Sequence, residues 1–182
     1  MNKMTTRTLL MAMAMMITSV SYAQDAGYIG VQYGQFRTSD ASQNNGDHED
    51  MDHIGVSIGA NLLPTISLEA QYTTNVNDKQ LGAGSTLSSQ VIGAYAKIQT
   101  PTPVYVNGRI GVARVDYELD TPLFNYTEST DGLSYGVGVG IKLADTASIE
   151  ANYTRLPDLE DQSFNNADIK NELLTVGVNF HF

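Results

Sequence analysis

The chain has 182 residues with 20 acidic and 10 basic side chains, a net charge of −10 and no cysteine. An acidic protein repels phosphate, so a nucleic-acid partner is disfavoured. Without cysteine the chain can form neither a disulfide framework nor a thiolate zinc site. Apolar residues make up 42% of the chain, too many for a disordered protein. After residue 23, no apolar run reaches the ~18 residues of a membrane helix.

The first 23 residues have the layout of a secretory signal peptide. Lys3 and Arg7 form a positive start, residues 9–17 are an unbroken apolar run, and residues 21–23 (Ser-Tyr-Ala) carry small residues at both ends. The apolar run is too short to span a bilayer, and no charged segment follows to stop transfer. We therefore expect export and cleavage after Ala23. The mature domain, residues 24–182, would then have 159 residues and a net charge of −12, since the signal holds two bases and no acids.

Eight segments of the mature chain alternate between apolar and polar residues with a period of two. Side chains of a β-strand point alternately to opposite faces, so each segment has one apolar and one polar face. The apolar positions run over residues 29–33, 54–60, 66–72, 92–98, 104–112, 135–143, 149–153 and 174–182. No comparable run has the 3.6-residue period of a helix. The pattern predicts an all-β fold.

The connections between these segments alternate in length. Three are short turns and four are long loops, in the order 37–52 (long), 61–65 (short), 74–87 (long), 99–103 (short), 116–132 (long), 144–147 (short) and 157–168 (long). Such alternation is expected of successive antiparallel hairpins that place all long loops at one end. Eight tilted strands of about ten residues also match the thickness of a bilayer core. We predict an eight-stranded antiparallel up-and-down transmembrane β-barrel.

Charged side chains decide which face of the barrel meets lipid. A soluble barrel would bury its apolar face inside, whereas a membrane barrel turns that face outward. The polar face holds charges of both signs: Glu69, Lys97, Arg109, Lys142 and Glu150. Facing lipid, a basic residue near the mid-plane would cost ~2–4 kcal/mol. We therefore expect the polar face to line the interior.

Aromatic residues on the apolar face lie near the strand ends. Tyr33, Tyr72, Tyr135 and Tyr153 are close to the long loops, and Phe180 and Phe182 are at the opposite end. Aromatic side chains concentrate at both membrane interfaces of transmembrane barrels. The four tyrosines are therefore predicted to form an aromatic girdle.

These features together resemble a known family. The signal peptide, the eight segments, the strands GVGVGIKL and SIEANYTRL, and the terminal LLTVGVNFHF resemble the OmpA-like, opacity-type outer-membrane barrels (the "porin family") of Gram-negative bacteria. The resemblance covers the whole mature chain, and no periplasmic peptidoglycan-binding domain is expected. It implies a location in the cell outer membrane, in contact with its lipid and lipopolysaccharide. It also implies that the outer-membrane assembly machinery reads the terminal strand through Val176, Val178, Phe180 and Phe182.

The five inward charges have two interpretations. An eight-stranded barrel is just wide enough for side chains to fill it. Because an unpaired buried charge is costly, Glu69, Lys97, Arg109, Lys142 and Glu150 should form hydrogen-bonded pairs. We favour an ionic plug over a selective pore. Inward glycines leave space that either bulky side chains or water could occupy.

A second cluster has the composition of a metal site. Asp47, His48, Glu49, Asp50, Asp52 and His53 combine carboxylate and imidazole ligands, but they lack the glycine punctuation of a calcium loop. We favour a solvated acidic loop here and expect neither a resident metal nor a cofactor.

The favoured function is that of a non-enzymatic outer-membrane barrel with a structural and surface-interaction role. The first alternative is a narrow porin-like channel for small solutes or ions. A lipid-modifying enzyme is least favoured, because His48, His53 and His181 are the only histidines and His181 has no serine near it in sequence.

The predicted long loops are strongly acidic. They hold 15 of the 20 acids, opposed there only by Arg37 and Lys79. A surface of this sign repels polyanions at close range. We expect contact with lipopolysaccharide or sulfated glycans to run through Mg²⁺ or Ca²⁺ held by loop carboxylates, or the preferred surface partners to be basic. The alternative is that the acidity only solvates the surface.

Deletion of Phe182 tests the predicted assembly signal. The variant should remain in the periplasm and be degraded, because it lacks the aromatic residue that ends the alternating strand. Immunoblots of fractionated cells would measure this, with an alanine replacement of the inward-facing neighbour His181 as the control. Normal outer-membrane levels of the deletion variant would refute the prediction.

Overall fold

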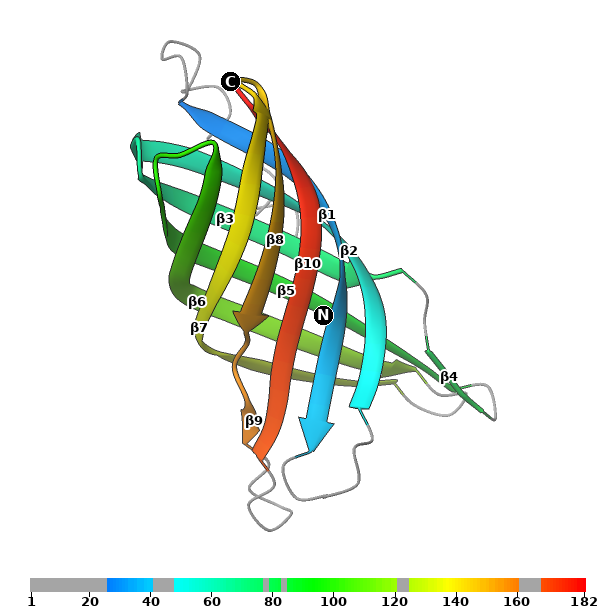
Figure 1. Ribbon diagram of the computed structural model, residues 1–182. Coiled ribbons are helices and arrows are strands. Elements are labelled where there is room, and N and C mark those ends of the chain that lie inside the picture. Colours follow the sequence, from blue (N-terminus) through cyan, green and yellow to red (C-terminus); the bar gives the residue numbers. More distant parts are fainter. Residues whose placement is uncertain (1–25, 41–47, 77–78, 83–84, 121–124, 161–167) are drawn as a thin grey trace.

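The computed structural model describes residues 26–40, 48–76, 79–82, 85–120, 125–160 and 168–182 (Figure 1). The predicted signal peptide lies outside these residues and remains a prediction. No helix within the described ranges is long and apolar enough to cross a membrane.

The described residues form one antiparallel sheet. Its strands are β1 (Gly27–Asp40), β2 (His48–Leu63), β3 (Ile66–Asn75), β4 (Lys79–Gly82), β5 (Ser85–Gln99), β6 (Val104–Asp120), β7 (Asn125–Ala144), β8 (Ala147–Arg155), β9 (Leu159–Glu160) and β10 (Asp168–His181). Neighbours along the chain pair with each other, while β4 and β9 are short additions beside β5 and β10. The other eight strands make a closed wall, so the predicted eight-stranded up-and-down barrel is confirmed (Figure 1).

The first and last strands close the barrel. β1 pairs with β10 over its whole length, from Tyr28 opposite His181 to Asp40 opposite Ile169. At the end with the short turns, the Gly27 amide donates to the Phe182 carbonyl (3.2 Å) and the Phe182 amide donates to the Gly27 carbonyl (3.0 Å). The terminal residue is therefore part of the seam that closes the sheet.

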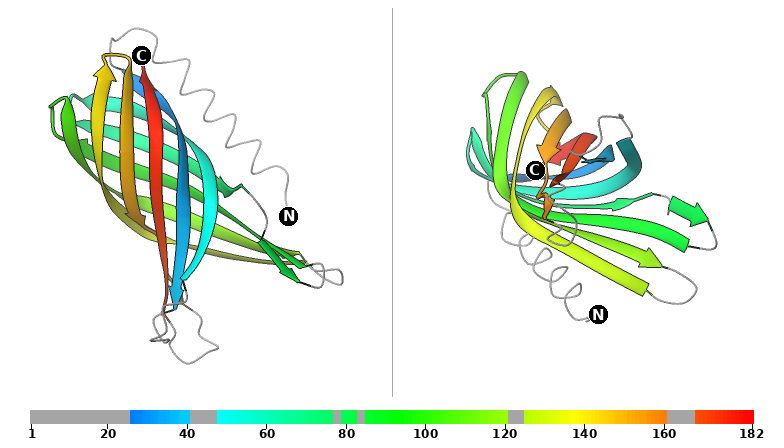
Figure 2. Two further views of the ribbon diagram at one scale, coloured as in Figure 1. Left: turned by 45° about the vertical axis from the view of Figure 1, so that its right-hand side comes forward. Right: turned by 90° about the horizontal axis from the view of Figure 1, so that it is seen from below.

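The long loops are shorter than predicted, because the strands continue into the residues that were predicted to be loops. β6 has 17 residues and β7 has 20, whereas about 9–11 residues cross a bilayer. The pairing of β7 with β8 starts only at Tyr135 opposite Arg155, and the pairing of β2 with β3 ends at His53 opposite Asn75. Beyond these points the wall divides into two groups of strands. One holds β1, β2, β9 and β10, and the other holds β4, β5, β6 and β7 (Figure 2).

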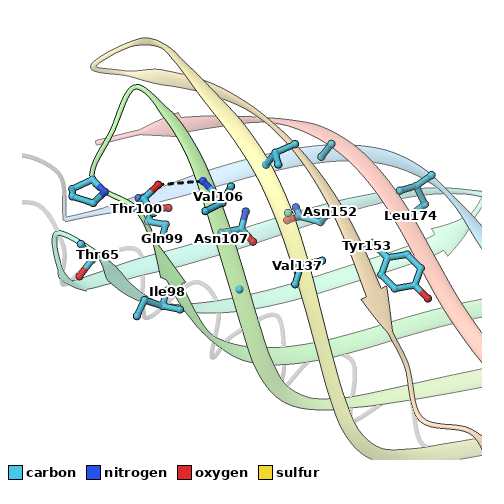
Figure 3. Close-up of a pocket in the computed structure, with 15 residues that line it drawn as sticks. Thr65, Ile98, Gln99, Thr100, Val106, Asn107, Val137, Asn152, Tyr153 and Leu174 are labelled. Atoms are coloured by element: carbon cyan, nitrogen blue, oxygen red, sulfur yellow. Dashed lines mark hydrogen bonds between the residues drawn. The ribbon is translucent and has the colours of Figure 1, made fainter.

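Large apolar side chains cover the outside of the wall. One row across neighbouring strands runs from Ile98 on β5 through Gly108, Val137 and Tyr153 to Leu174 on β10. Figure 3 shows Ile98, Val137, Tyr153 and Leu174 along this row, on the outer surface. Ile98, Val137 and Leu174 are each more than half exposed. We call this outward apolar surface the lipid band.

Both faces of the wall change polarity at the long-loop end. Above the lipid band, outward positions are polar, as at Gln35 on β1, Asp52 on β2 and Arg114 on β6, all exposed. Inward positions become apolar at the same level. Seven residues, here called the cap core, are at most 6% exposed and pack together: Phe36, Met51, Val91, Ala113, Val115, Leu156 and Leu173. This apolar cluster in the lumen was not predicted.

Tyr117 packs against the cap core from above. Its ring meets Phe36 edge-on, with 6.1 Å between the centroids. Burial raises the pKa of the Tyr117 hydroxyl, which stays protonated and donates to Asn171 Oδ1 at 2.9 Å. The Asn171 amide in turn donates to the Pro157 carbonyl (2.9 Å). These bonds tie β6 to β10 and to the segment that follows β8.

Inward glycines make room for bulky side chains in the lower lumen. A Cβ added at Gly59 would clash with the ring of Tyr28, and one at Gly140 would clash with the ring of Tyr105. Tyrosine rings occupy the space that a side chain would need at these two positions, which explains why both are glycine.

Candidate functional site

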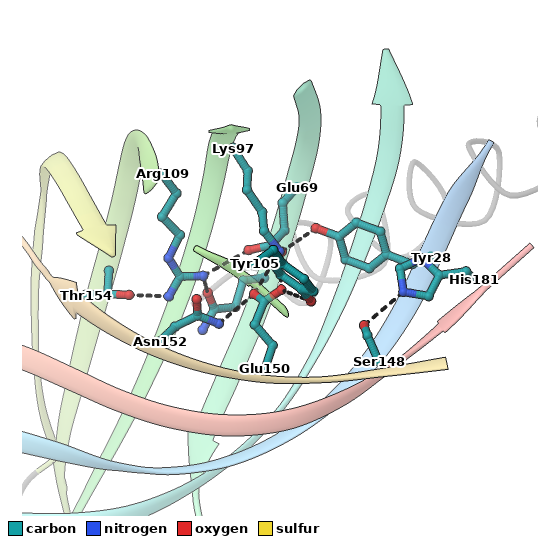
Figure 4. Close-up of polar contacts among 11 residues, drawn as sticks. Tyr28, Glu69, Lys97, Tyr105, Arg109, Ser148, Glu150, Asn152, Thr154 and His181 are labelled. Carbon is teal, nitrogen blue, oxygen red and sulfur yellow. Dashed lines mark hydrogen bonds and ion pairs between the residues drawn. The ribbon is translucent and has the colours of Figure 1, made fainter. Parts of the chain in front are cut away.

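The centre of the lumen holds two buried ion pairs (Figure 4). Arg109 on β6 donates through Nη1 to Glu69 Oε1 on β3 and to Gln71 Oε1, each at 2.9 Å, and through Nη2 to Thr154. Lys97 on β5 donates to both carboxylate oxygens of Glu150 on β8, each at 2.7 Å. Lys97 Nζ also lies 3.7 Å from Glu69 Oε2, which joins the two pairs into one network.

Tyrosine and asparagine side chains complete this network. Tyr28 donates to Glu69 Oε2 at 2.5 Å, and Tyr105 donates to Glu150 Oε2 at 2.9 Å. Asn152 donates to Glu150 Oε1 at 2.8 Å. Lys97 Nζ lies 5.2 Å from the centre of the Tyr28 ring, a distance at which a cation is attracted to the ring face. The carboxylates are therefore satisfied by several donors at once.

The four charged side chains are almost fully shielded from solvent. Glu69, Lys97, Arg109 and Glu150 are each at most 6% exposed. Two negative and two positive groups balance, so the network carries no net charge. Removing a charge from water costs several kcal/mol, which only good geometry and further hydrogen bonds can offset. The hydrogen bonds of Lys97 to both oxygens of Glu150 and the three hydrogen bonds of Arg109 offset this cost.

Lys142 does not belong to this network. Its side chain is exposed and lies with Asp145 at the mouth of the lumen. The prediction that Lys142 pairs inside the barrel is therefore wrong. Lys142 keeps the inward parity, since it is opposite Ser148 in the β7–β8 pairing, but it lies at the open mouth of the lumen, where water surrounds its charge.

Little free space remains beside the ion pairs. A small cavity next to Arg109 and Glu150 has room for about one water molecule. Towards the short turns the lumen widens into a vestibule of about 480 Å³, where Tyr28, Lys97 and Tyr105 form part of the wall.

Two histidines bond to serines that are distant in sequence. His53 Nε2 lies 2.9 Å from Ser89 Oγ below the cap core, and His181 Nε2 lies 2.9 Å from Ser148 Oγ near the vestibule. No serine lies near His181 in sequence, but the pairing of β8 with β10 brings Ser148 to it, and the sequence analysis did not predict this contact. Ser89 is 2% exposed and Ser148 is 0% exposed, so neither hydroxyl is open to a substrate.

The weak metal candidates do not converge where the structure describes them. Asp52 is exposed on the outer face, whereas the next residue, His53, is buried in the lumen. Asp47 and the side chains of His48, Glu49 and Asp50 lie outside the described residues. Among the side chains that are described, no group of three metal-ligating residues comes together.

The predicted girdle and terminal residues lie on the outer face. Tyr33, Tyr135 and Tyr153 are 53%, 55% and 41% exposed, while Tyr72 is half-buried and donates to Gln90 at 3.3 Å. In the terminal strand, exposed or half-buried outward positions are Val176, Val178, Phe180 and Phe182. Their role as an assembly signal remains a prediction.

A closed antiparallel wall with an apolar exterior and a charged, paired interior defines a transmembrane β-barrel. Residues 6–182 match the family model of the outer membrane protein beta-barrel domain, and the chain therefore belongs to this family of the cell outer membrane. Short turns of such barrels face the periplasm, so the vestibule is periplasmic and the cap core lies at the extracellular end.

Solved structures share this fold. Neisserial surface protein A has a TM-score of 0.67 and 16% identity, covering 86% of this chain and 97% of that one. Ail, the attachment invasion locus protein of Yersinia pestis, has a TM-score of 0.63 and 14% identity, with the same coverage of 86% and 97%. The N-terminal barrel of Pseudomonas aeruginosa OprF has a TM-score of 0.58 and 16% identity, covering 86% and 99%. Comparison with curated proteins finds no match.

Replacement of Arg109 by Ala should destabilise the barrel by about 3–5 kcal/mol, because it strands the buried Glu69 carboxylate. Urea unfolding of the protein in lipid vesicles would measure the loss. Lys142→Ala is the matched control and should stay within about 0.5 kcal/mol of the unmutated protein, since that side chain is exposed. An unfolding midpoint for Arg109→Ala equal to that of the control would contradict a stabilising buried pair.

Proposed function

We propose that this protein is a non-enzymatic outer-membrane barrel whose lumen is plugged and whose extracellular end contacts surface partners. The observation that carries the proposal is the buried network of Glu69, Lys97, Arg109 and Glu150, which is neutral and fills the middle of the lumen. A hydrated ion that crossed this layer would have to break contacts of 2.7–2.9 Å between buried charges.

The serine–histidine pairs support a non-enzymatic role. A nucleophilic serine must be reachable by the bond that it attacks, and the catalytic base must touch it in an open site. Ser89 and Ser148 are both buried inside the barrel wall. Hydrolysis or transfer of a lipid would need an open pair at the lipid band or at the surface.

The extracellular end supports a role in surface contact. Eleven charged side chains described there lie beyond the lipid band and form what we call the charged belt: Arg37, Asp52, Arg114, Asp116, Glu118, Glu128, Asp131, Arg155, Asp158, Lys170 and Glu172. Seven are acidic and four are basic, so the belt is net negative.

Basic side chains of the charged belt form salt bridges with neighbouring acidic side chains. Arg114 donates to Asp116 Oδ1 at 2.8 Å. Arg155 contacts Asp158 at 2.9 Å and Glu172 at 3.1 Å. These pairs reduce the positive charge that a phosphate or sulfate group could meet. Ail has been solved in complex with the heparin analogue sucrose octasulfate. For the present chain we propose that such polyanions bind through divalent cations held by belt carboxylates, or that basic partners bind instead.

Planar-bilayer recordings test the plugged lumen. The refolded protein should give no conductance steps above the background of the bilayer, because the buried ion pairs leave no continuous aqueous path. Heat-modifiable gel mobility would establish that the recorded protein is folded. Large, reproducible steps from the unmutated protein would instead support the alternative of a narrow channel.

Binding to immobilised heparin and to lipopolysaccharide tests the belt. We expect binding in Mg²⁺ or Ca²⁺ and its loss on addition of a chelator, because the belt itself repels polyanions. A variant with Asp116 and Asp131 replaced by Asn should bind less in the presence of the cation. Strong binding that survives chelation and weakens with salt would show that Arg37, Arg114, Arg155 and Lys170 act as a direct anion site.

A further inference from the structure

We propose that the cap core seals the lumen at its extracellular end, as an apolar barrier separate from the ion pairs below it. This inference rests on the closed lumen proposed above and states how that closure is divided. The lumen then has two barriers in series, an ionic one inside the membrane and an apolar one above it.

The order of inward residues along single strands separates the two barriers. On β3, Glu69 is followed by Gln71 and Thr73, all buried, in the direction of the extracellular end. On β10, Leu173 of the cap core is followed by Thr175, buried, in the direction of the periplasm. A layer of uncharged polar side chains therefore lies between the ion pairs and the cap core.

Several groups of this middle layer lack a partner in the described part of the protein. Gln32 Nε2, Gln71 Nε2, Thr73 Oγ1 and Thr175 Oγ1 are buried and make no hydrogen bond there. Buried polar groups are normally satisfied by protein or by water. Water is the ligand that these donors and acceptors require. We infer that the middle layer holds bound water between the ion pairs and the cap core.

The cap core itself is built to exclude water. Phe36 and Val115 are 0% exposed, Leu173 is 1% exposed, and the cluster contains no charged side chain. Phe36 stacks on the His53 ring at 5.3 Å between centroids, which covers the upper side of the polar layer. Apolar constrictions block water and ions by dewetting. The seal therefore does not depend on the ion pairs.

The two groups of strands both contribute to the cap core. Phe36, Met51 and Leu173 come from β1, β2 and β10, whereas Val91 and Val115 come from β5 and β6. These groups are no longer paired with each other at this level (Figure 2). Side-chain contacts join the two groups instead, from Tyr117 to Asn171 and between His53 and Ser89.

Cysteine accessibility tests the seal, because the chain has no cysteine of its own. Thr175→Cys places one thiol between the barriers, at a position that is 1% exposed. Intact cells are treated with a membrane-impermeant thiosulfonate reagent. With the cap core intact, we expect no modification from outside. When Phe36→Ser and Leu173→Ser are added, modification should go to completion. Gln35→Ser, the outward neighbour of Phe36, is the matched control and should leave the thiol protected.

Variants are scored only when heat-modifiable mobility shows a folded barrel, and Leu173→Ser alone provides a milder change. A protected thiol in the folded cap variants would overturn the inference. So would an ion-pair variant, Glu69→Gln with Arg109→Gln, that exposes the thiol to outside reagent while the cap core is unchanged. Failure of the ion-pair plug alone gives a different result: reagent admitted to the periplasm modifies Thr175→Cys, while the intact cap core still protects the thiol from reagent outside the cell.

Discussion

Backbone pairing in hydrocarbon is the constraint on which this structure depends. An unpaired amide or carbonyl group costs several kcal/mol in lipid, so a sheet can cross the membrane only when its edges meet. The closing seam joins β1 to β10 and ends in the reciprocal bonds between Gly27 and Phe182. Once the wall is closed, alternation along each strand assigns one face to lipid and the other to a narrow interior. That interior is too small for free charges, and the ion pairs follow from this.

The outer face of each long strand meets lipid over one part of its length and water over another. Within the lipid band, apolar side chains point outward and polar side chains point inward, because lipid surrounds the wall. Above the band, water surrounds the wall, and the arrangement inverts: Gln35 is exposed while Phe36 is buried. Extending the strands beyond the membrane is favourable because the extension buries an apolar core of its own. β6, which exceeds the length needed to cross a bilayer, contributes Ala113 and Val115 to this core.

The period-two pattern was enough to predict the strands, the closure, the outward tyrosines and four of the five lumen charges. It failed at the two ends of the lumen, where parity does not show what surrounds an inward side chain. Phe36 is a large apolar residue at an inward position that follows the inward Gln32 and Gly34, and the pattern of outward apolar residues did not predict an apolar core on the inner face. Parity correctly places Lys142 on the inward face, opposite Ser148, but parity does not show that this position lies at the open mouth of the lumen, away from the ion pairs. The contact of His181 with Ser148 depends on which strands become neighbours, and spacing along the chain does not contain this information.

The neutrality of the lumen network has a consequence for voltage. A membrane potential performs about 2.3 kcal/mol of work per elementary charge moved through 100 mV. Glu69, Lys97, Arg109 and Glu150 are joined by contacts of 2.7–3.7 Å and carry two charges of each sign. If they shift together, no net charge crosses the field and the potential performs almost no work on them. A potential across the membrane therefore exerts almost no net force on the ion pairs at the centre of this barrel.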